Sequence, residues 1–179
     1  PGNTPTHDTA DSEHLTIFVH RSRPTDTPER ARPRTRTSKT VQKMRIAVVG
    51  SGYVGLVSGA CFSEMGAEVV CIDTDASKIE QLKNGRIPIY EPGLDAIVQK
   101  NMQSGRLSFE TDLASCMDGI EIVFIAVGTP PDENGDADLR YVFEVARTFG
   151  SAVKEYALLV TKSTVPVGTS RRIQQVVRQ

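Results

Sequence analysis

The sequence lacks tryptophan, has only three cysteines among 179 residues, and contains no histidine beyond position 20. Three cysteines without a Cys-x-x-Cys pair indicate neither a disulfide framework nor a structural zinc site. Because His7, His14 and His20 are the only histidines, most of the chain has no histidine to serve as a base or a metal ligand. We therefore expect no metal and a reducing, cytoplasmic setting.

Long apolar runs and a strong charge excess are missing as well. No stretch comes near the ~18 consecutive apolar residues of a membrane helix, and the N-terminus has no apolar core of the signal-peptide kind. The formal net charge is −1, which argues against nucleic acid as the main partner. We therefore expect neither a membrane nor a nucleic acid as partner.

Composition divides the chain at residue 44. Residues 1–43 hold eight Lys or Arg, five Asp or Glu and five prolines, and their apolar residues cluster only at 15–19. Such a segment buries too little apolar surface to offset its chain entropy, so we predict a disordered, basic extension over 1–43. The Arg-rich stretch 30–36 leaves open a tether to nucleic acid or an anionic membrane, or part of a transit peptide. Residues 44–179 are predicted to form one folded domain.

Short apolar runs alternate with amphipathic segments throughout the predicted domain. The runs are typical of strands buried on both faces, and they lie at 46–49, 69–72, 107–109, 122–127 and 157–160. Helical patterns follow at 53–65, 75–83, 94–98, 139–153 and 169–178. This alternation predicts an α/β fold with a parallel sheet. Because a doubly wound dinucleotide-binding sheet usually has six strands, we expect a Rossmann-type sheet truncated after its fifth strand, with an open edge.

The motif Gly50-x-Gly52-x-x-Gly55 follows the first strand of this domain and opens its first helix. In that context the first glycine permits a tight turn, the second lets a pyrophosphate approach the backbone, and the third lets helix and strand pack closely. The N–H groups of a helix N-terminus also favour phosphates. A turn that merely needs glycines is the alternative. Tyr53, in the first helical turn, could face a ligand or simply pack.

Asp73 ends the second strand of the domain, 18 residues after Gly55. An acid at this spacing hydrogen-bonds the ribose 2′-hydroxyl of NAD in Rossmann domains. A helix cap or a solvated strand end is the alternative. Lys78, on the next helix, could equally be a plain surface lysine or contact the adenosine side of the cofactor. The glycine motif together with Asp73 predicts NAD as the cofactor.

Two further motifs follow strands. The first is Val127-Gly128-Thr129-Pro130, and the second spans residues 162–168. Residues at the carboxyl ends of parallel strands line the ligand crevice of such folds, although either motif could be an ordinary turn. The hydroxyls of Ser163 and Thr164 could hold a water molecule or a nicotinamide amide. The acidic loop 132–138 lacks the spacing of a calcium loop, and we interpret Cys61, Cys71 and Cys116 as packing residues rather than nucleophiles.

With the segment 85–94, these motifs resemble the UDP-glucose/GDP-mannose dehydrogenase family over residues 44–179. The runs Pro-Ile-Tyr-Glu-Pro-Gly-Leu at 88–94 and Lys-Ser-Thr-Val-Pro-Val-Gly at 162–168 are far more specific than the glycine motif. The resemblance implies an NAD-dependent dehydrogenase that oxidises the C6 hydroxyl of UDP-glucose to an aldehyde and then, through a cysteine thioester, to the carboxylate of UDP-glucuronate. It further implies a homo-oligomeric enzyme of polysaccharide biosynthesis.

The resemblance also assigns residues. It implies that Thr164 helps to hold the catalytic water, and that the family's nucleophilic cysteine with its lysine and asparagine partners lies downstream of this segment. The chain alone is therefore expected to be inactive. A dehydrogenase of GDP-mannose or of a UDP-N-acetylhexosamine, or a stand-alone NAD-sensing module, remains an alternative. The positions that match the family's NAD-binding residues are Gly50, Ser51, Gly52, Tyr53, Val54, Gly55, Asp73, Lys78, Val127, Gly128, Thr129, Pro130, Ser163, Thr164 and Val165.

Overall fold

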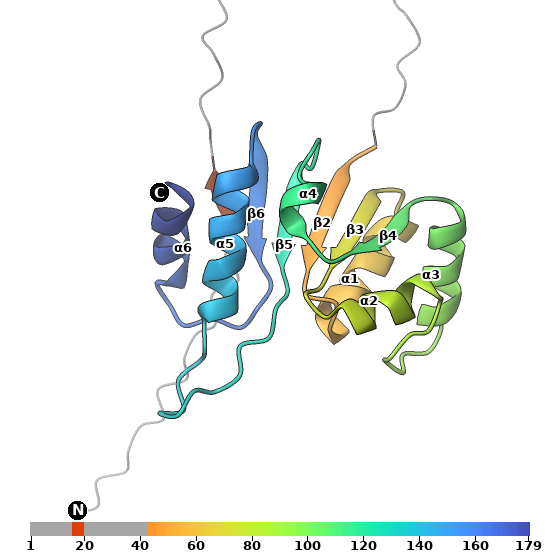
Figure 1. The fold of residues 1–179 in the computed structure, drawn as a ribbon, viewed down its shortest axis with the longest axis horizontal. Helices are drawn as coiled ribbons and strands as arrows, with labels where there is room; N and C mark the ends of the chain where they lie inside the picture. Colours follow the sequence, from red (N-terminus) through yellow and green to blue (C-terminus); the bar gives the residue numbers. More distant parts are fainter. Residues whose placement is uncertain (1–15, 20–42) are drawn as a thin grey trace, which may run out of the picture.

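A six-stranded sheet with helices on both faces forms the structure, a computed structural model that describes residues 16–19 and 43–179 (Figure 1). The strands are β1 (Thr16–Val19), β2 (Arg45–Val49), β3 (Glu68–Ile72), β4 (Leu107–Glu110), β5 (Ile122–Ile125) and β6 (Ala157–Thr161). The helices are α1 (Tyr53–Glu64), α2 (Ala76–Lys83), α3 (Leu94–Gln103), α4 (Leu113–Cys116), α5 (Arg140–Ala152) and α6 (Thr169–Val177).

Five strands of this sheet are parallel, as the sequence pattern predicts. The strand order is β1-β6-β5-β2-β3-β4, and every neighbouring pair from β6 to β4 runs parallel. From β2 at the centre, the chain winds outward to β4 and then returns through β5 to β6. This reversal of direction leaves a crevice between the carboxyl ends of β2 and β5, which is where doubly wound sheets bind their ligands.

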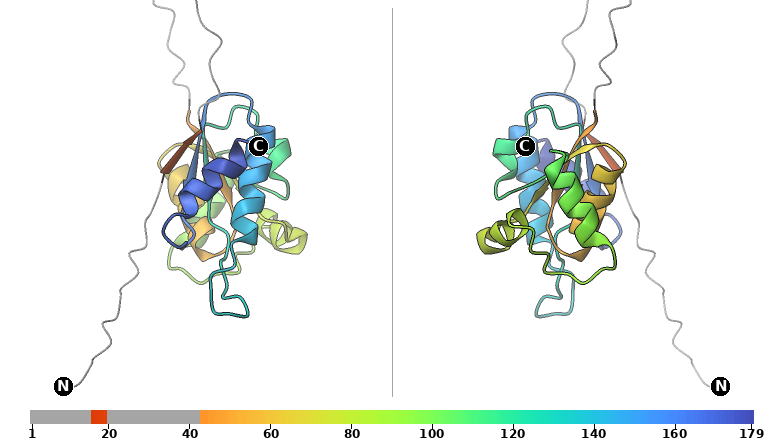
Figure 2. Two further views of the ribbon diagram at one scale, coloured as in Figure 1. Left: turned by 90° about the vertical axis from the view of Figure 1, so that its left-hand side faces the viewer. Right: turned by 90° about the vertical axis from the view of Figure 1, so that its right-hand side faces the viewer.

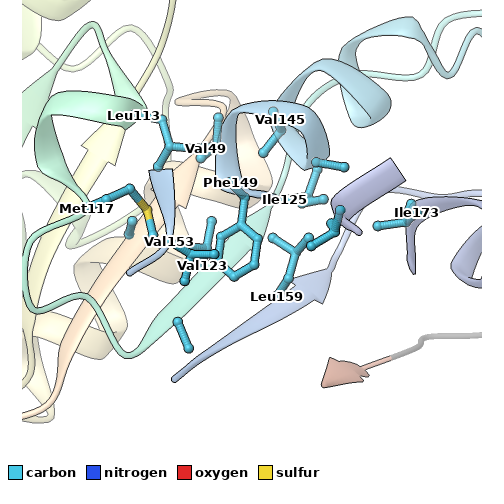
Figure 3. Packing of buried hydrophobic residues seen from close by; sticks show 14 of the residues in the cluster. Val49, Leu113, Met117, Val123, Ile125, Val145, Phe149, Val153, Leu159 and Ile173 are labelled. Carbon is cyan, nitrogen blue, oxygen red and sulfur yellow. The ribbon is translucent and has the colours of Figure 1, made fainter. Parts of the chain in front are cut away.

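Alternate residues of the central strands enter two separate hydrophobic cores. Ala47 and Val49 of β2 join one cluster with α4, α5 and α6, whereas Ile46 and Val48 join the other with α1, α2 and α3. Figure 2 shows α1 and α5 on opposite sides of the sheet. Figure 3 shows Phe149 of α5 at the middle of the first cluster, where its ring is fully buried. Burying a phenylalanine of this kind contributes roughly 1.5–3 kcal/mol to stability.

The second core depends on a close contact between α1 and β3. A Cβ atom on Gly59 would lie 2.4 Å from the sulfur of Cys71, so only glycine fits at this point of α1. Burial raises the pKa of the Cys71 thiol to about 12, which keeps it protonated and unreactive. Cys71 is thus a packing residue, as expected. Cys61 is exposed on α1, so the packing interpretation is wrong for that residue.

The edge strand β1 differs from the sequence-based expectation. It pairs antiparallel with β6, with Thr16 opposite Val160 and Val19 opposite Ala157. Disorder was expected over the whole of 1–43, together with an open edge beyond the fifth strand, and both expectations are wrong at these four residues. The physical reason is that the free edge of β6 carries unpaired backbone N–H and C=O groups, which an extended segment can satisfy. Of the rest of the predicted disordered extension, the structure describes only Lys43; residues 1–15 and 20–42, which include 30–36, lie outside the described residues.

Candidate functional site

The glycine motif forms the turn that joins β2 to α1. Gly50 has φ +103°, and a Cβ atom there would lie 2.5 Å from the carbonyl oxygen of Ala126. A Cβ atom on Gly55 would lie only 1.7 Å from the carbonyl oxygen of Gly50. Both glycines are therefore required by close backbone contacts, at the turn and at the start of the helix.

Gly52 differs from its two neighbours in the motif because open space surrounds it. No protein atom lies within 4 Å of the position that its Cβ would take. Gly52 is also the N-cap of α1, and since it has no side chain it leaves the first N–H groups of the helix uncapped. The hydroxyl of Ser51 is 1% exposed and has no hydrogen-bond partner among the described residues. Unsatisfied donors of this kind at a helix N-terminus suit an anionic ligand such as a phosphate.

Asp73 directly follows β3, and its carboxylate lies over the glycine turn. Its Oδ2 accepts hydrogen bonds from the Ser51 N–H at 2.9 Å and from Nζ of Lys78 at 2.8 Å. Its Oδ1 accepts one from the Asp75 N–H at 3.1 Å. Burial by itself would raise the pKa of Asp73, but the hydrogen bonds from Lys78, Asp75 and Ser51 and the charge of Lys78 together lower it. Asp73 is therefore ionised at neutral pH and acts as an acceptor in the crevice.

A cavity of about 380 Å³ opens at the carboxyl ends of β2, β3 and β5. Gly50, Gly52, Asp73 and Lys78 line it on the side of the glycine turn. Its size falls within the range of sites for small molecules and cofactors. The opposite walls come from the segment 111–113 at the start of α4 and from one face of α5. This face begins with Tyr141. It continues three, four and seven positions later with Glu144, Val145 and Thr148, which is the spacing of residues on one side of a helix.

The two predicted motifs after β5 and β6 are joined by hydrogen bonds. The hydroxyl of Thr129 donates to the carbonyl oxygen of Thr164 at 3.0 Å, and the hydroxyl of Ser163 donates to the carbonyl oxygen of Val127 at 2.6 Å. Ser163 and Val165 are buried, whereas the side chain of Thr164 is exposed. Ser163 therefore uses its hydroxyl to hold the two loops together, and Thr164 presents its side chain to solvent beside them.

Ser51 and Gly55 are buried at the glycine turn and do not line the cavity. The other predicted residues divide into three groups. Gly50, Gly52, Asp73, Lys78, Val127 and Gly128 lie together around the cavity. The predicted residues that adjoin the cavity without lining it lie on the loops after β5 and β6, namely Thr129, Pro130, Ser163, Thr164 and Val165. Tyr53 and Val54 are 55% and 46% exposed, outside the lining of the cavity, and the hydroxyl of Tyr53 donates to Oε2 of Glu91 at 2.6 Å.

The walls of the cavity that α4 and α5 form were not predicted from the sequence. The helical period of α5 identifies the face that packs on the sheet, but Tyr141 and Thr148 flank that face and carry no distinctive motif. The topology was the only signal for this wall. The helix that connects β5 to β6 must pack on the sheet beside the crevice, so one of its faces can line the cavity.

A second cavity of similar size, about 390 Å³, lies at the opposite ends of the strands. It is formed by the loops that lead into β5 and β6, and Asp118, Glu121 and Lys154 are among its lining residues. It lies at the amino ends of the strands, where doubly wound folds do not bind their ligands. The cavity at the carboxyl ends is therefore the candidate functional site.

Three further findings concern the described part of the chain. No group of three or more His, Cys, Asp or Glu side chains there could hold a metal ion. In the acidic loop, Oδ1 of Asp132 accepts hydrogen bonds from the N–H groups of Asn134 and Asp136, an arrangement that closes a turn. None of the helices described over 43–179 is long and apolar enough to cross a membrane.

Comparison with known proteins gives consistent matches. The sequence matches a family described as "UDP-glucose/GDP-mannose dehydrogenase family, NAD binding domain" over residues 44–179. It is 53% identical over 135 residues to UDP-glucose 6-dehydrogenase TuaD of Bacillus subtilis, a match that covers 75% of this chain and 29% of TuaD. It is 50% identical over 137 residues to UDP-glucose 6-dehydrogenase of Rhizobium meliloti, with 76% of this chain and 31% of that protein covered.

Solved structures agree with these relatives. GDP-mannose dehydrogenase from Pseudomonas aeruginosa, in a ternary complex, gives a TM-score of 0.71 at 40% identity, over 75% of this chain and 32% of that one. UDP-glucose dehydrogenase from Pyrobaculum islandicum gives a TM-score of 0.68 at 36% identity, over 79% and 34%. The chain therefore spans about 30% of the length of the curated relatives that it matches.

The contrast between Gly52 and Gly55 gives a direct test of the site. Gly55→Ala places a methyl group against the Gly50 carbonyl oxygen, so we expect a loss of about 2 kcal/mol or more in the free energy of unfolding. Gly52→Ala meets no protein atom, so its cost should be limited to about 1 kcal/mol, the disadvantage of alanine at an N-cap. It should nevertheless weaken dinucleotide binding, since its methyl group enters the open space at the helix N-terminus. Chemical denaturation and calorimetric titration measure the two effects, and unchanged binding by Gly52→Ala would count against this site.

The lowered pKa of Asp73 predicts a specific dependence of stability on pH. A carboxyl group whose pKa is lower in the folded state stabilises the fold above its unfolded pKa, and this contribution is lost as the pH falls through the folded pKa. We expect Asp73→Asn to cost about 1 kcal/mol at pH 7, because the three hydrogen bonds that the carboxylate accepts lose their charge at a partly exposed site. The difference from the wild type should shrink below pH 4 and vanish under more acidic conditions, since the ordinary pKa is 3.8. Denaturant unfolding over this range measures it, with Asp118→Asn as an exposed control, and a constant difference at all pH values would contradict the assignment.

Proposed function

Because the chain belongs to the UDP-glucose/GDP-mannose dehydrogenase family, we propose that residues 44–179 are the NAD-binding portion of an enzyme that oxidises UDP-glucose to UDP-glucuronate with two NAD. The observation that carries the proposal is the ionised Asp73 beside the glycine turn, at the mouth of the 380 Å³ cavity. UDP-glucose is favoured as substrate because matched UDP-glucose 6-dehydrogenases are 53%, 50% and 47% identical to this chain, against 42% for GDP-mannose 6-dehydrogenase of Pseudomonas aeruginosa.

The residues present fit the cofactor. NAD, when bound, supplies the hydride acceptor for oxidation of the alcohol. The N–H groups at the start of α1, with the buried Ser51 hydroxyl, would hold the pyrophosphate. Asp73 would accept a hydrogen bond from the adenosine ribose, and the apolar side chains of Leu113 and Val145 offer surfaces for the adenine ring. Tyr53 and Val54 would contribute through the backbone of the helical turn.

The loops after β5 and β6 would serve the nicotinamide end of the cofactor. We place Thr129, Pro130, Ser163 and Val165 there as positioning residues, and Thr164 as the residue that holds the catalytic water. The support for Thr164 is its exposed side chain on a loop tied to the end of β5, together with the family resemblance. The resemblance also supports a homo-oligomeric, cytoplasmic enzyme that supplies UDP-glucuronate for polysaccharide biosynthesis.

The position of Asp73 predicts a preference for NAD over NADP. A 2′-phosphate would face this carboxylate, and two like charges about 4 Å apart repel by roughly 1–4 kcal/mol in partly solvated surroundings. Lys78 offsets part of this repulsion, since its ammonium group lies 2.8 Å from the carboxylate. We expect NAD to bind at least about tenfold more tightly than NADP, and Asp73→Asn to narrow this gap while Lys78→Gln widens it. Calorimetric titration of both cofactors decides the matter, and equal binding by the wild type would exclude Asp73 from the ribose site.

The proposed function is tested by exchanging domains between relatives. Residues 44–179 of this chain replace the matching segment of UDP-glucose 6-dehydrogenase TuaD, to which they are 53% identical. We expect the chimera to form NADH in the presence of NAD and UDP-glucose, and the same chimera with Gly52→Ala to form much less. The present chain alone should bind NAD without sugar-dependent NADH formation, because the nucleophile and base of the family are expected outside this segment. A folded chimera that binds NAD but oxidises no UDP-glucose would refute the proposal.

A further inference from the structure

A hydrogen bond joins the first residue of α1 to the loop that leads into α3. The hydroxyl of Tyr53 donates to Oε2 of Glu91 at 2.6 Å, across 38 residues of sequence. The Glu91 carboxylate raises the pKa of Tyr53, first through the hydrogen bond and then through its charge. The phenol therefore keeps its proton at neutral pH and remains a donor to Glu91.

The loop 84–93 is held firmly on either side of this bond. Ile87 and Ile89 pack against the hydrophobic cluster that contains Leu56 of α1. The carbonyl oxygen of Glu91 accepts a hydrogen bond from the Leu94 N–H at 3.1 Å, at the point where α3 begins. The packing of Ile87 and Ile89 therefore holds this loop against the core. The Glu91 carboxylate is thereby positioned to accept the hydrogen bond from Tyr53.

Tyr53 itself occupies a sensitive place. It directly follows Gly52, the residue with open space around it at the N-terminus of α1. The preceding part of the turn is held by hydrogen bonds from the Gly50 N–H to the Ile72 carbonyl oxygen and from the Ser51 N–H to Asp73. Gly52 has no side chain to restrain the helix entry that follows, so the Tyr53 side chain adds a restraint from a different part of the chain. The side chain of Tyr53 is outside the lining of the cavity, so its hydroxyl is directed to the loop and not to the ligand.

We propose that Tyr53 and Glu91 are a positioning pair, which fixes the first turn of α1 against the loop 84–93 and thereby sets the affinity for the cofactor's pyrophosphate. This role rests on the proposed function, since it presumes that NAD binds at this turn. It makes a prediction opposite to that of simple electrostatics. A carboxylate near an anion site repels phosphate, so its removal would tighten binding if charge alone mattered. If Glu91 instead acts through Tyr53, its removal loosens the turn and weakens binding.

The experiment measures NAD affinity by calorimetry in the full chain and its variants. We expect Tyr53→Phe and Glu91→Ala each to weaken binding by about threefold to tenfold, as one charge-assisted hydrogen bond at an exposed site allows. The double variant should bind NAD no less tightly than the single variant with the lower affinity, because the two residues act as one unit. Glu91→Gln keeps an acceptor oxygen for the phenol but loses the charge, so its affinity should lie between those of the wild type and Glu91→Ala. Tyr90→Phe is the matched control, since Tyr90 lies on the same loop with 93% of its surface exposed.

A second readout follows the pair without any cofactor. Alkaline titration of tyrosinate absorbance, taken as the difference between the wild type and Tyr53→Phe, isolates the ionisation of Tyr53. We expect it to occur at a higher pH in the wild type than in Glu91→Ala. Tighter NAD binding by Glu91→Ala, additive losses in the double variant, or unchanged affinity in all variants would overturn the positioning role and leave the proposed function intact. If the wild-type chain shows the shifted ionisation of Tyr53 but binds no NAD, both the positioning role and the proposed function would be overturned.

Discussion

The start of α1 is in direct backbone contact with the turn that precedes it, and this contact determines the geometry of the whole site. The carbonyl oxygen of Gly50 occupies the space into which a side chain at position 55 would project. Gly50 also lies against the backbone of Ala126, which brings the end of β5 to the same point. Asp73, at the end of β3, bonds to the Ser51 N–H within the turn. Three strand ends are therefore fixed around one short stretch of backbone that tolerates no side chains at its contact points.

A second constraint is electrostatic, because two negative groups must share this crevice. The N-terminus of α1 is suited to a pyrophosphate, yet the Asp73 carboxylate lies beside it. The structure satisfies that carboxylate with the Ser51 N–H and the Lys78 ammonium group, so that much of its charge is already balanced. Another carboxylate, that of Glu91, accepts a hydrogen bond from the hydroxyl of Tyr53 in the first turn of α1. Charge is thus distributed so that an anion and a hydroxyl group of one ligand can be bound side by side.

The sequence predicted those parts of the molecule that depend on local pattern. Buried strands, the glycine turn and Asp73 all carry signals within a few residues, and the parallel topology follows from their alternation with helices. Thr129 and Ser163 were predicted as site residues, but only the structure shows that they join the two loops. The cavity wall of α5 and the Tyr53–Glu91 bond were missed because they depend on which helix face meets which loop. The four-residue helix α4 is too short to show a period, and β1 escaped detection because pairing at a sheet edge depends on the free backbone groups of a distant strand.

The central claim is that the cavity at the carboxyl ends of the strands, built around the glycine turn and Asp73, binds the dinucleotide. An NMR titration of the ¹⁵N-labelled chain with NAD tests it most directly, because each backbone amide reports on its own surroundings. The account predicts that the largest shift changes fall at residues 50–55, at Asp73 and along the cavity-lining face of α5. Shift changes confined to the loops around the other cavity, at 114–121 and 152–156, would contradict it.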